Sequence, residues 1–156
     1  MLDHVHRVLA GQPIYPKPSS DFVATMYTPG YYYVSAAVAW MIGEGFVAPR
    51  LVSLVSSLAI CALVFHAVRR ETSDLYAASV SAFLLAATFR AAGSRFDLAR
   101  PDSLCLALWL AAAVRPRFAT RPRHDLVAGA LLSASILTKQ TALLLALPLA
   151  AHAIAT

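Results

Sequence analysis

The sequence predicts an all-α fold: a polytopic transmembrane helical bundle with additional interfacial helices. Of its 156 residues, 59% are hydrophobic and 13% are charged, whereas soluble domains are typically about 45–50% apolar and about 25% charged. A water-soluble fold of this size could not bury so much apolar surface. The net charge of +5 comes from basic residues that lie mostly between apolar runs, as in loops that flank membrane helices. Because these basic residues are not interleaved with aromatics, we expect no nucleic-acid partner.

Residues 1–45 predict an outer-face loop that carries two interfacial helices. The stretch LDHVHRVLAG places its apolar side chains on one helical face, and Gly11 and Pro13 follow as helix breakers. A second apolar stretch, Tyr31–Ile42, is too short to cross about 30 Å of hydrocarbon. Its tyrosines and Trp40 suit the headgroup layer. We therefore expect both helices to lie along the membrane surface.

Residues 46–156 predict spanning or partly spanning helices, at about 48–68, 75–89, 102–114, 126–138 and 141–155. Serines in the first of these favour a close approach of neighbouring helices. The arginine-rich segments Arg69–Asp74 and Arg115–His124 are separated by two apolar stretches, so they belong on one side, and the positive-inside rule makes that side cytoplasmic. Residues 1–45 and Arg90–Asp102 then face outward. The pattern indicates a multi-pass protein of the bacterial inner membrane, with the lipid bilayer as its surroundings.

The last apolar region carries Lys139 and Gln140 in its middle. A continuous helix would place the lysine near mid-bilayer, at a cost of about 2.5–3.5 kcal/mol. Two shorter helices that meet at these residues would avoid this cost, with the break facing a water-filled cavity. One interpretation is a lysine that extends to the interface from an ordinary helix end. The other is a cation directed at an anionic ligand.

The stretch FDLARPDSL brings Asp97, Arg100 and Asp102 together just before another helix. Pro101 suits a first helical position, and Asp102 in the first turn favours the positive end of the helix dipole, which is a complete structural explanation. On the predicted topology, however, these groups share the outer side with Lys139. Two carboxylates and two cations on one membrane face suit a ligand that bears a phosphate and a hydroxyl to be deprotonated.

Five stretches follow one another in a recognisable order: LDHVHRVLAGQPIY, YTPGYYYVSAAVAWMIG, RLVSLVSSLAI, RPDSLCLALWLA and ASILTKQTALLL. Together they resemble the integral-membrane glycosyltransferases of the GT-C fold, near the dolichyl-phosphate-mannose protein mannosyltransferases and their bacterial relatives. The resemblance covers most of the chain. One departure is Gly30, which stands where the family often has a second proline.

The resemblance implies an enzyme that moves a hexose from a polyprenyl-phosphate-linked donor to a glycan, lipid or protein acceptor on the outer side. It implies that Lys139 lies near the carrier phosphate, and Arg100 is a second candidate for holding that phosphate. We also assign Gln140 and Tyr32 to substrate binding. Tyr32 and its neighbours either stack on a sugar ring or belong to an aromatic belt at the interface.

The candidate carboxylates are Asp102 and Asp3. Asp102 is a candidate for orienting the sugar, the acceptor or a divalent metal. The resemblance implies that the base is an acidic residue of the first outer loop, and Asp3 is the nearest acid in this chain. A polyprenyl phosphate is already a good leaving group, so no strong general acid and no certain cofactor is required. Nucleotide-binding loops and metal-ligand motifs are absent from the sequence.

Family members run to several hundred residues, so we expect this chain to be a fragment that lacks both ends and is inactive alone. The rival interpretation is non-enzymatic. It is a helical membrane protein, part of a transporter or an accessory subunit, that binds an anionic ligand at the broken helix around Lys139. A transporter would show a second half that echoes the first.

Overall fold

A computed structural model describes residues 1–17, 27–88, 91, 98–118 and 122–155. Within these residues the regular structure is entirely helical, which confirms the predicted fold class. The helices are α1 (Leu2–Leu9), α2 (Gly30–Ile42), α3 (Val47–Thr72), α4 (Leu75–Ala87), α5 (Asp102–Phe118), α6 (Pro122–Thr138) and α7 (Ala142–Ala155).

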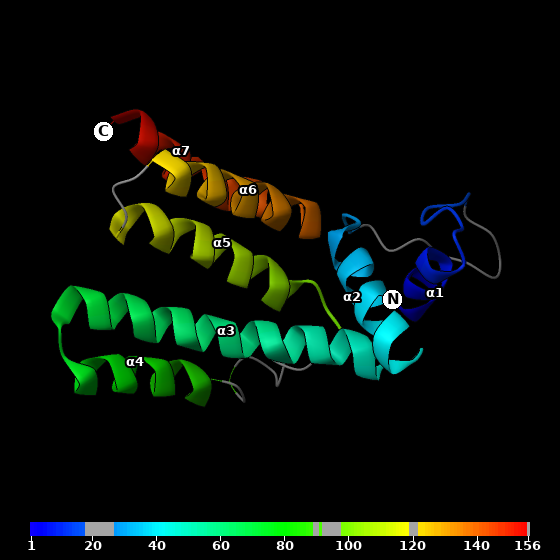
Figure 1. The fold of residues 1–156 in the computed structure, drawn as a ribbon, viewed down its shortest axis with the longest axis horizontal. Helices are drawn as coiled ribbons and strands as arrows, with labels where there is room; N and C mark the ends of the chain where they lie inside the picture. The colour runs from blue at the N-terminus through cyan, green and yellow to red at the C-terminus, as the bar shows by residue number, and fades with distance from the viewer. Residues whose placement is uncertain (18–26, 89–90, 92–97, 119–121, 156) are drawn as a thin grey trace.

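The five helices α3 to α7 run roughly alongside one another, while α1 and α2 lie at one end of this bundle (Figure 1). Helix α3 packs between α4 and α5, and α5 in turn packs against α6 and α7. Helix α2 contacts α3 and α6, and α1 contacts α2. The two N-terminal helices therefore cover the end of the bundle at which α6 stops and α7 starts.

Helix α3 is the one helix in the described part of the chain that is long and apolar enough to cross a membrane. Its 26 residues extend about 39 Å at about 1.5 Å per residue, more than the roughly 30 Å of a hydrocarbon core. Only 28% of its most apolar stretch is buried, unlike the core helix of a soluble protein. Its buried face carries Val52, Ser53, Ser56, Ser57 and Ile60.

Three helices extend beyond the apolar stretches that predicted them, and one of these, α6, begins at Pro122 rather than near residue 126. Helix α3 was expected to end near residue 68, but it runs to Thr72 and is terminated by Ser73, which adopts the left-handed conformation at φ 55°. Asp74 then caps α4, because its carboxylate accepts the Tyr76 N–H at 2.8 Å. Helix α5 was expected to end near residue 114 and instead continues to Phe118.

The extended ends of α3 and α5 contact each other. Arg117 forms an ion pair with Glu71, and the Arg70 guanidinium lies 5.4 Å from the centre of the Phe118 ring. These contacts join the ends of the two helices at the surface. They also place Arg69–Asp74 and the start of the second arginine-rich segment at the same end of the bundle, while residues 119–121 lie outside the described residues.

Helix α1 packs on α2 through one side. Val5 is buried with Ala36 and Ala39, and His6 Nδ1 lies 2.8 Å from Glu44 Oε2 in the turn after α2. His4 is not one of the apolar residues of α1, yet it is buried, because its ring stacks on the Tyr32 ring of α2. Burial lowers the pKa of His4 below its ordinary value.

Candidate active site

The chain breaks its last apolar region at Lys139. Helix α6 ends at Thr138 and α7 begins at Ala142, so a continuous helix through the lysine does not form. The Lys139 N–H still bonds to Ser135 O at 3.0 Å, and the Lys139 carbonyl accepts the Ala142 N–H at 3.0 Å. Lys139 therefore closes the last turn of one helix and opens the first turn of the next.

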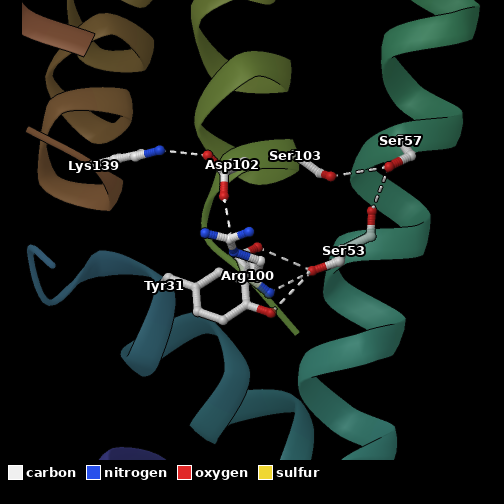
Figure 2. Close-up of polar contacts among 7 residues, drawn as sticks. All are labelled: Tyr31, Ser53, Ser57, Arg100, Asp102, Ser103 and Lys139. Atoms are coloured by element: carbon white, nitrogen blue, oxygen red, sulfur yellow. Dashed lines mark hydrogen bonds and ion pairs between the residues drawn. The ribbon is translucent and has the colours of Figure 1, made fainter. Parts of the chain in front are cut away.

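The Lys139 ammonium forms an ion pair with Asp102 Oδ1, across the gap between α6 and α5 (Figure 2). The second oxygen of the same carboxylate lies 3.5 Å from Arg100 Nε. The Lys139 side chain is 21% exposed, against 40% for Arg100 and 48% for Asp102. Lys139 is thus not directed into bulk solvent, and the two cations and one carboxylate leave the cluster with one positive charge.

Tyr27 completes this cluster, and sequence reasoning missed it. Its ring centre lies 5.9 Å from Lys139 Nζ, within the range of a cation–π contact. A hydrogen bond to Tyr27, followed by the charge of Asp102, raises the pKa of Arg100 above its ordinary value. The Tyr15 hydroxyl donates to the Tyr27 carbonyl at 2.5 Å. The only signal of Tyr27 in the sequence is its place at the start of the YTPGYYY stretch.

The start of α2 lies directly against the end of α6. Thr28 Oγ1 donates to Ile136 O at 3.1 Å. A Cβ added to Gly30 would lie 2.6 Å from Leu137 O and 3.1 Å from Thr138 N, closer than real Cβ contacts allow. Glycine is therefore needed here for a close backbone approach, and this approach fixes the turn of α6 that immediately precedes Lys139.

Helix α3 contacts the chain on both sides of Asp102, at the backbone of Arg100 and at the side chain of Ser103 (Figure 2). Ser53 Oγ donates to Arg100 O at 3.1 Å, and Ser57 Oγ lies 3.1 Å from Ser103 Oγ. Ser53 also contacts the Tyr31 hydroxyl at 3.0 Å. From the sequence, the serines of this helix were expected to act only as small residues that allow close packing.

The structure also describes Tyr32, Gln140 and Asp3, which were assigned to the site from the sequence. Tyr32 is completely buried and stacks on His4, with ring centres 4.6 Å apart. Gln140 is exposed in the turn between α6 and α7. Asp3 is exposed on α1, and among the described residues no hydrogen bond or ion pair joins it to the cluster. Asp97 lies outside the described residues. The roles given to Tyr32, Gln140 and Asp3 stay predictions.

The cluster offers little to a divalent metal. No group of three His, Cys, Asp or Glu side chains converges anywhere in the part of the chain that the structure describes. At the cluster itself, Asp102 is the carboxylate that the described residues supply, and its oxygens are held by two cations. Magnesium and calcium are bound by several oxygen ligands, and the described residues of the cluster supply one carboxylate.

Comparison with known proteins places these residues in a family. The family model for dolichyl-phosphate-mannose-protein mannosyltransferase matches residues 26–156. The matched segment contains Tyr27, Arg100, Asp102 and Lys139, whereas α1 lies outside it. No curated protein and no solved structure matches the chain. Because the family model covers most of the 156 residues, the chain belongs to the dolichyl-phosphate-mannose-protein mannosyltransferase family.

Proposed function

We propose that the full-length protein that contains this chain transfers a hexose from a polyprenyl-phosphate-linked donor to a glycan, lipid or protein acceptor on the outer side of the bacterial inner membrane. The observation that carries the proposal is the convergence of Lys139 and Arg100 on Asp102, beside the break between two apolar helices. Membership in the mannosyltransferase family supports glycosyl transfer in general.

The charge of the cluster suits a lipid-borne phosphate. A sugar linked to a polyprenyl phosphate is a phosphodiester with one negative charge, and the cluster has one positive charge in excess. Ammonium and guanidinium groups both donate charge-assisted hydrogen bonds to phosphate oxygens. Lys139 is the least exposed of the three charged side chains in the cluster, and charge interactions are stronger where water is partly excluded.

The proposed reaction has a simple balance of bonds. The acceptor oxygen forms a bond to the anomeric carbon while the bond from that carbon to the phosphate oxygen breaks. The electron pair leaves with the phosphate, whose increased charge Lys139 and Arg100 stabilise. The proton of the acceptor hydroxyl passes to a carboxylate, for which Asp102 and Asp3 are the candidates. No general acid is needed, in contrast to glycoside hydrolysis, because phosphate leaves as an anion.

The proposed topology follows from the two ends of the bundle. The cluster lies at the end covered by α2, and the Arg117–Glu71 ion pair lies at the end where α3 meets α4 (Figure 1). Cytoplasmic loops are enriched in arginine, so we assign the second end to the cytoplasm. Helix α3 would cross the bilayer, with the shorter helices as partial or complete further passes. This arrangement would place the cluster on the outer side.

Transfer from a polyprenyl-phosphate hexose by membranes that contain the full-length protein tests this proposal. Lys139→Ala and Asp102→Asn should each lower transfer by roughly 10²-fold, the scale seen when one electrostatic contact to developing charge is removed. Matched controls are Lys17→Ala, which removes the only other lysine, and Asp125→Asn in the first turn of α6. Full activity in both cluster variants, or no transfer by the native protein, would contradict the proposal.

A further inference from the structure

We propose that Tyr31 and Ser53 form a positioning pair that fixes the backbone of Arg100 and so directs its guanidinium toward the donor phosphate. This inference rests on the proposed function, because it concerns the same site. Neither hydroxyl contacts the charged atoms of the cluster, and both act through Arg100 (Figure 2). Both side chains are completely buried.

The first step is the contact between Ser53 and Arg100. Ser53 Oγ donates to the Arg100 carbonyl at 3.1 Å and accepts the Arg100 N–H at 3.4 Å. The same N–H also donates to Leu98 O at 2.7 Å. Arg100 lies just before α5 and outside any helix, so no helical ladder holds its backbone. A single hydroxyl on α3 therefore contacts both polar backbone groups of Arg100.

The second step is the contact between the two hydroxyls. The Tyr31 hydroxyl donates to Pro49 O at 2.7 Å and lies 3.0 Å from Ser53 Oγ. Only two hydroxyl protons are available for the contacts to Pro49 O, to Arg100 O and between the two hydroxyls, so one proton must be shared between two acceptors. Since a hydroxyl has one proton and two acceptor positions, the loss of either group changes the bonding of the other. Their burial leaves little water to replace a lost partner.

The third step links this pair to the charged groups. Ser53 and Ser57 lie one turn apart on α3, and they hold Arg100 and Ser103, which flank Asp102. Helix α3 therefore sets where the start of α5 lies. An error of about 1 Å in the placement of a group that contacts the substrate can cost about 10²-fold in rate. A role in positioning Arg100 is thus large enough to measure.

The test uses steady-state kinetics of hexose transfer with the full-length native protein and its variants in membranes. Ser53→Ala should lower kcat/KM for the polyprenyl-phosphate donor at least tenfold, with the KM for the acceptor unchanged. Ser53→Thr keeps a hydroxyl and should recover most of the loss. The matched control is Ser56→Ala, because Ser56 is also buried but donates to Val52 O at 2.7 Å within α3 itself. This control should match the native protein.

A double variant that also carries Arg100→Ala separates a positioning role from a general structural effect. In an Arg100→Ala protein, Ser53→Ala should cause no further loss, because the hydroxyl acts through the missing side chain. Tyr31→Phe keeps the buried ring and removes only the hydroxyl. It should lower kcat/KM for the donor in the native protein and cause no further loss in the Arg100→Ala protein, so it serves as the test if Ser53→Ala disturbs folding. An additive loss in the Arg100→Ala background would overturn the inference.

The failure of this inference differs from the failure of the proposed function. If Ser53→Ala and Tyr31→Phe transfer like the native protein while Lys139→Ala does not, the positioning role is wrong and the function stands. If Lys139→Ala is also fully active, the proposed function fails, and the inference fails with it.

Discussion

Replacing Gly30 by alanine tests the packing that holds the break at Lys139. The added methyl group would meet three backbone atoms of the last turn of α6, the nearest being Leu137 O at 2.6 Å. Backbone atoms cannot rotate away as a flexible side chain would. Helices α2 and α6 must therefore separate by a distance on the order of 1 Å to restore ordinary contact.

The expected energy is the difference between two opposing terms. Overpacking a well-packed site typically costs about 1–3 kcal/mol, while replacing a helical glycine by alanine contributes about 0.5–1 kcal/mol in its favour. The net loss of stability for Gly30→Ala is then about 0–2.5 kcal/mol, with a midpoint of about 1 kcal/mol. For a chain of this length each kcal/mol lowers Tm by about 2–4 °C.

Thermal unfolding in a mild detergent measures this change, and the matched control is Gly129→Ala. Gly129 is also helical, but a Cβ added there would meet no atom within 4 Å. Gly129→Ala should therefore keep or raise the Tm, whereas Gly30→Ala should lower it and should also reduce hexose transfer. Equal stabilisation by both substitutions would refute the close approach of α2 to α6.

The remaining predictions concern titration and surface charge. Burial lowers the pKa of His4 below its ordinary value of 6.5. Around and below pH 6.5 the unfolded chain therefore binds more protons than the folded chain, so stability should fall as pH drops through 6.5. His4→Phe keeps an aromatic ring on Tyr32 and should flatten the dependence of Tm on pH below 6.5, whereas an unchanged slope would contradict the assignment. The Arg117–Glu71 pair is largely exposed, so Glu71→Gln should leave Tm unchanged, and a clear drop would show that the pair is structurally important.

Local signals in the sequence predicted the helices and where the chain turns. The placement of Lys139 inside an apolar run predicted the break between α6 and α7, because an unbroken apolar helix would hold a charge at depth. The arginine-rich stretches were predicted to lie on one side of the membrane, and the structure places the ends of α3 and α5 at the same end of the bundle. Each of these conclusions depends on residues that are neighbours in the chain.

The contacts that make the site depend on packing between distant residues, and no local pattern encodes them. Lys139 meets Asp102 across 37 positions, and Ser53 meets Arg100 across 47. Helical periodicity tells which side of a helix a residue occupies but not which helix faces it. For the same reason the pattern did not reveal that His4 is buried against Tyr32.

Equilibrium binding of a short-chain polyprenyl monophosphate to the protein in lipid nanodiscs tests the central claim most directly. The claim predicts saturable binding that exceeds binding of the unphosphorylated alcohol, that weakens at least tenfold in Lys139→Ala, and that is unchanged in Lys17→Ala. Equal affinity for the phosphate and the alcohol, or equal binding by native protein and Lys139→Ala, would contradict the claim that this cluster holds a lipid-borne phosphate.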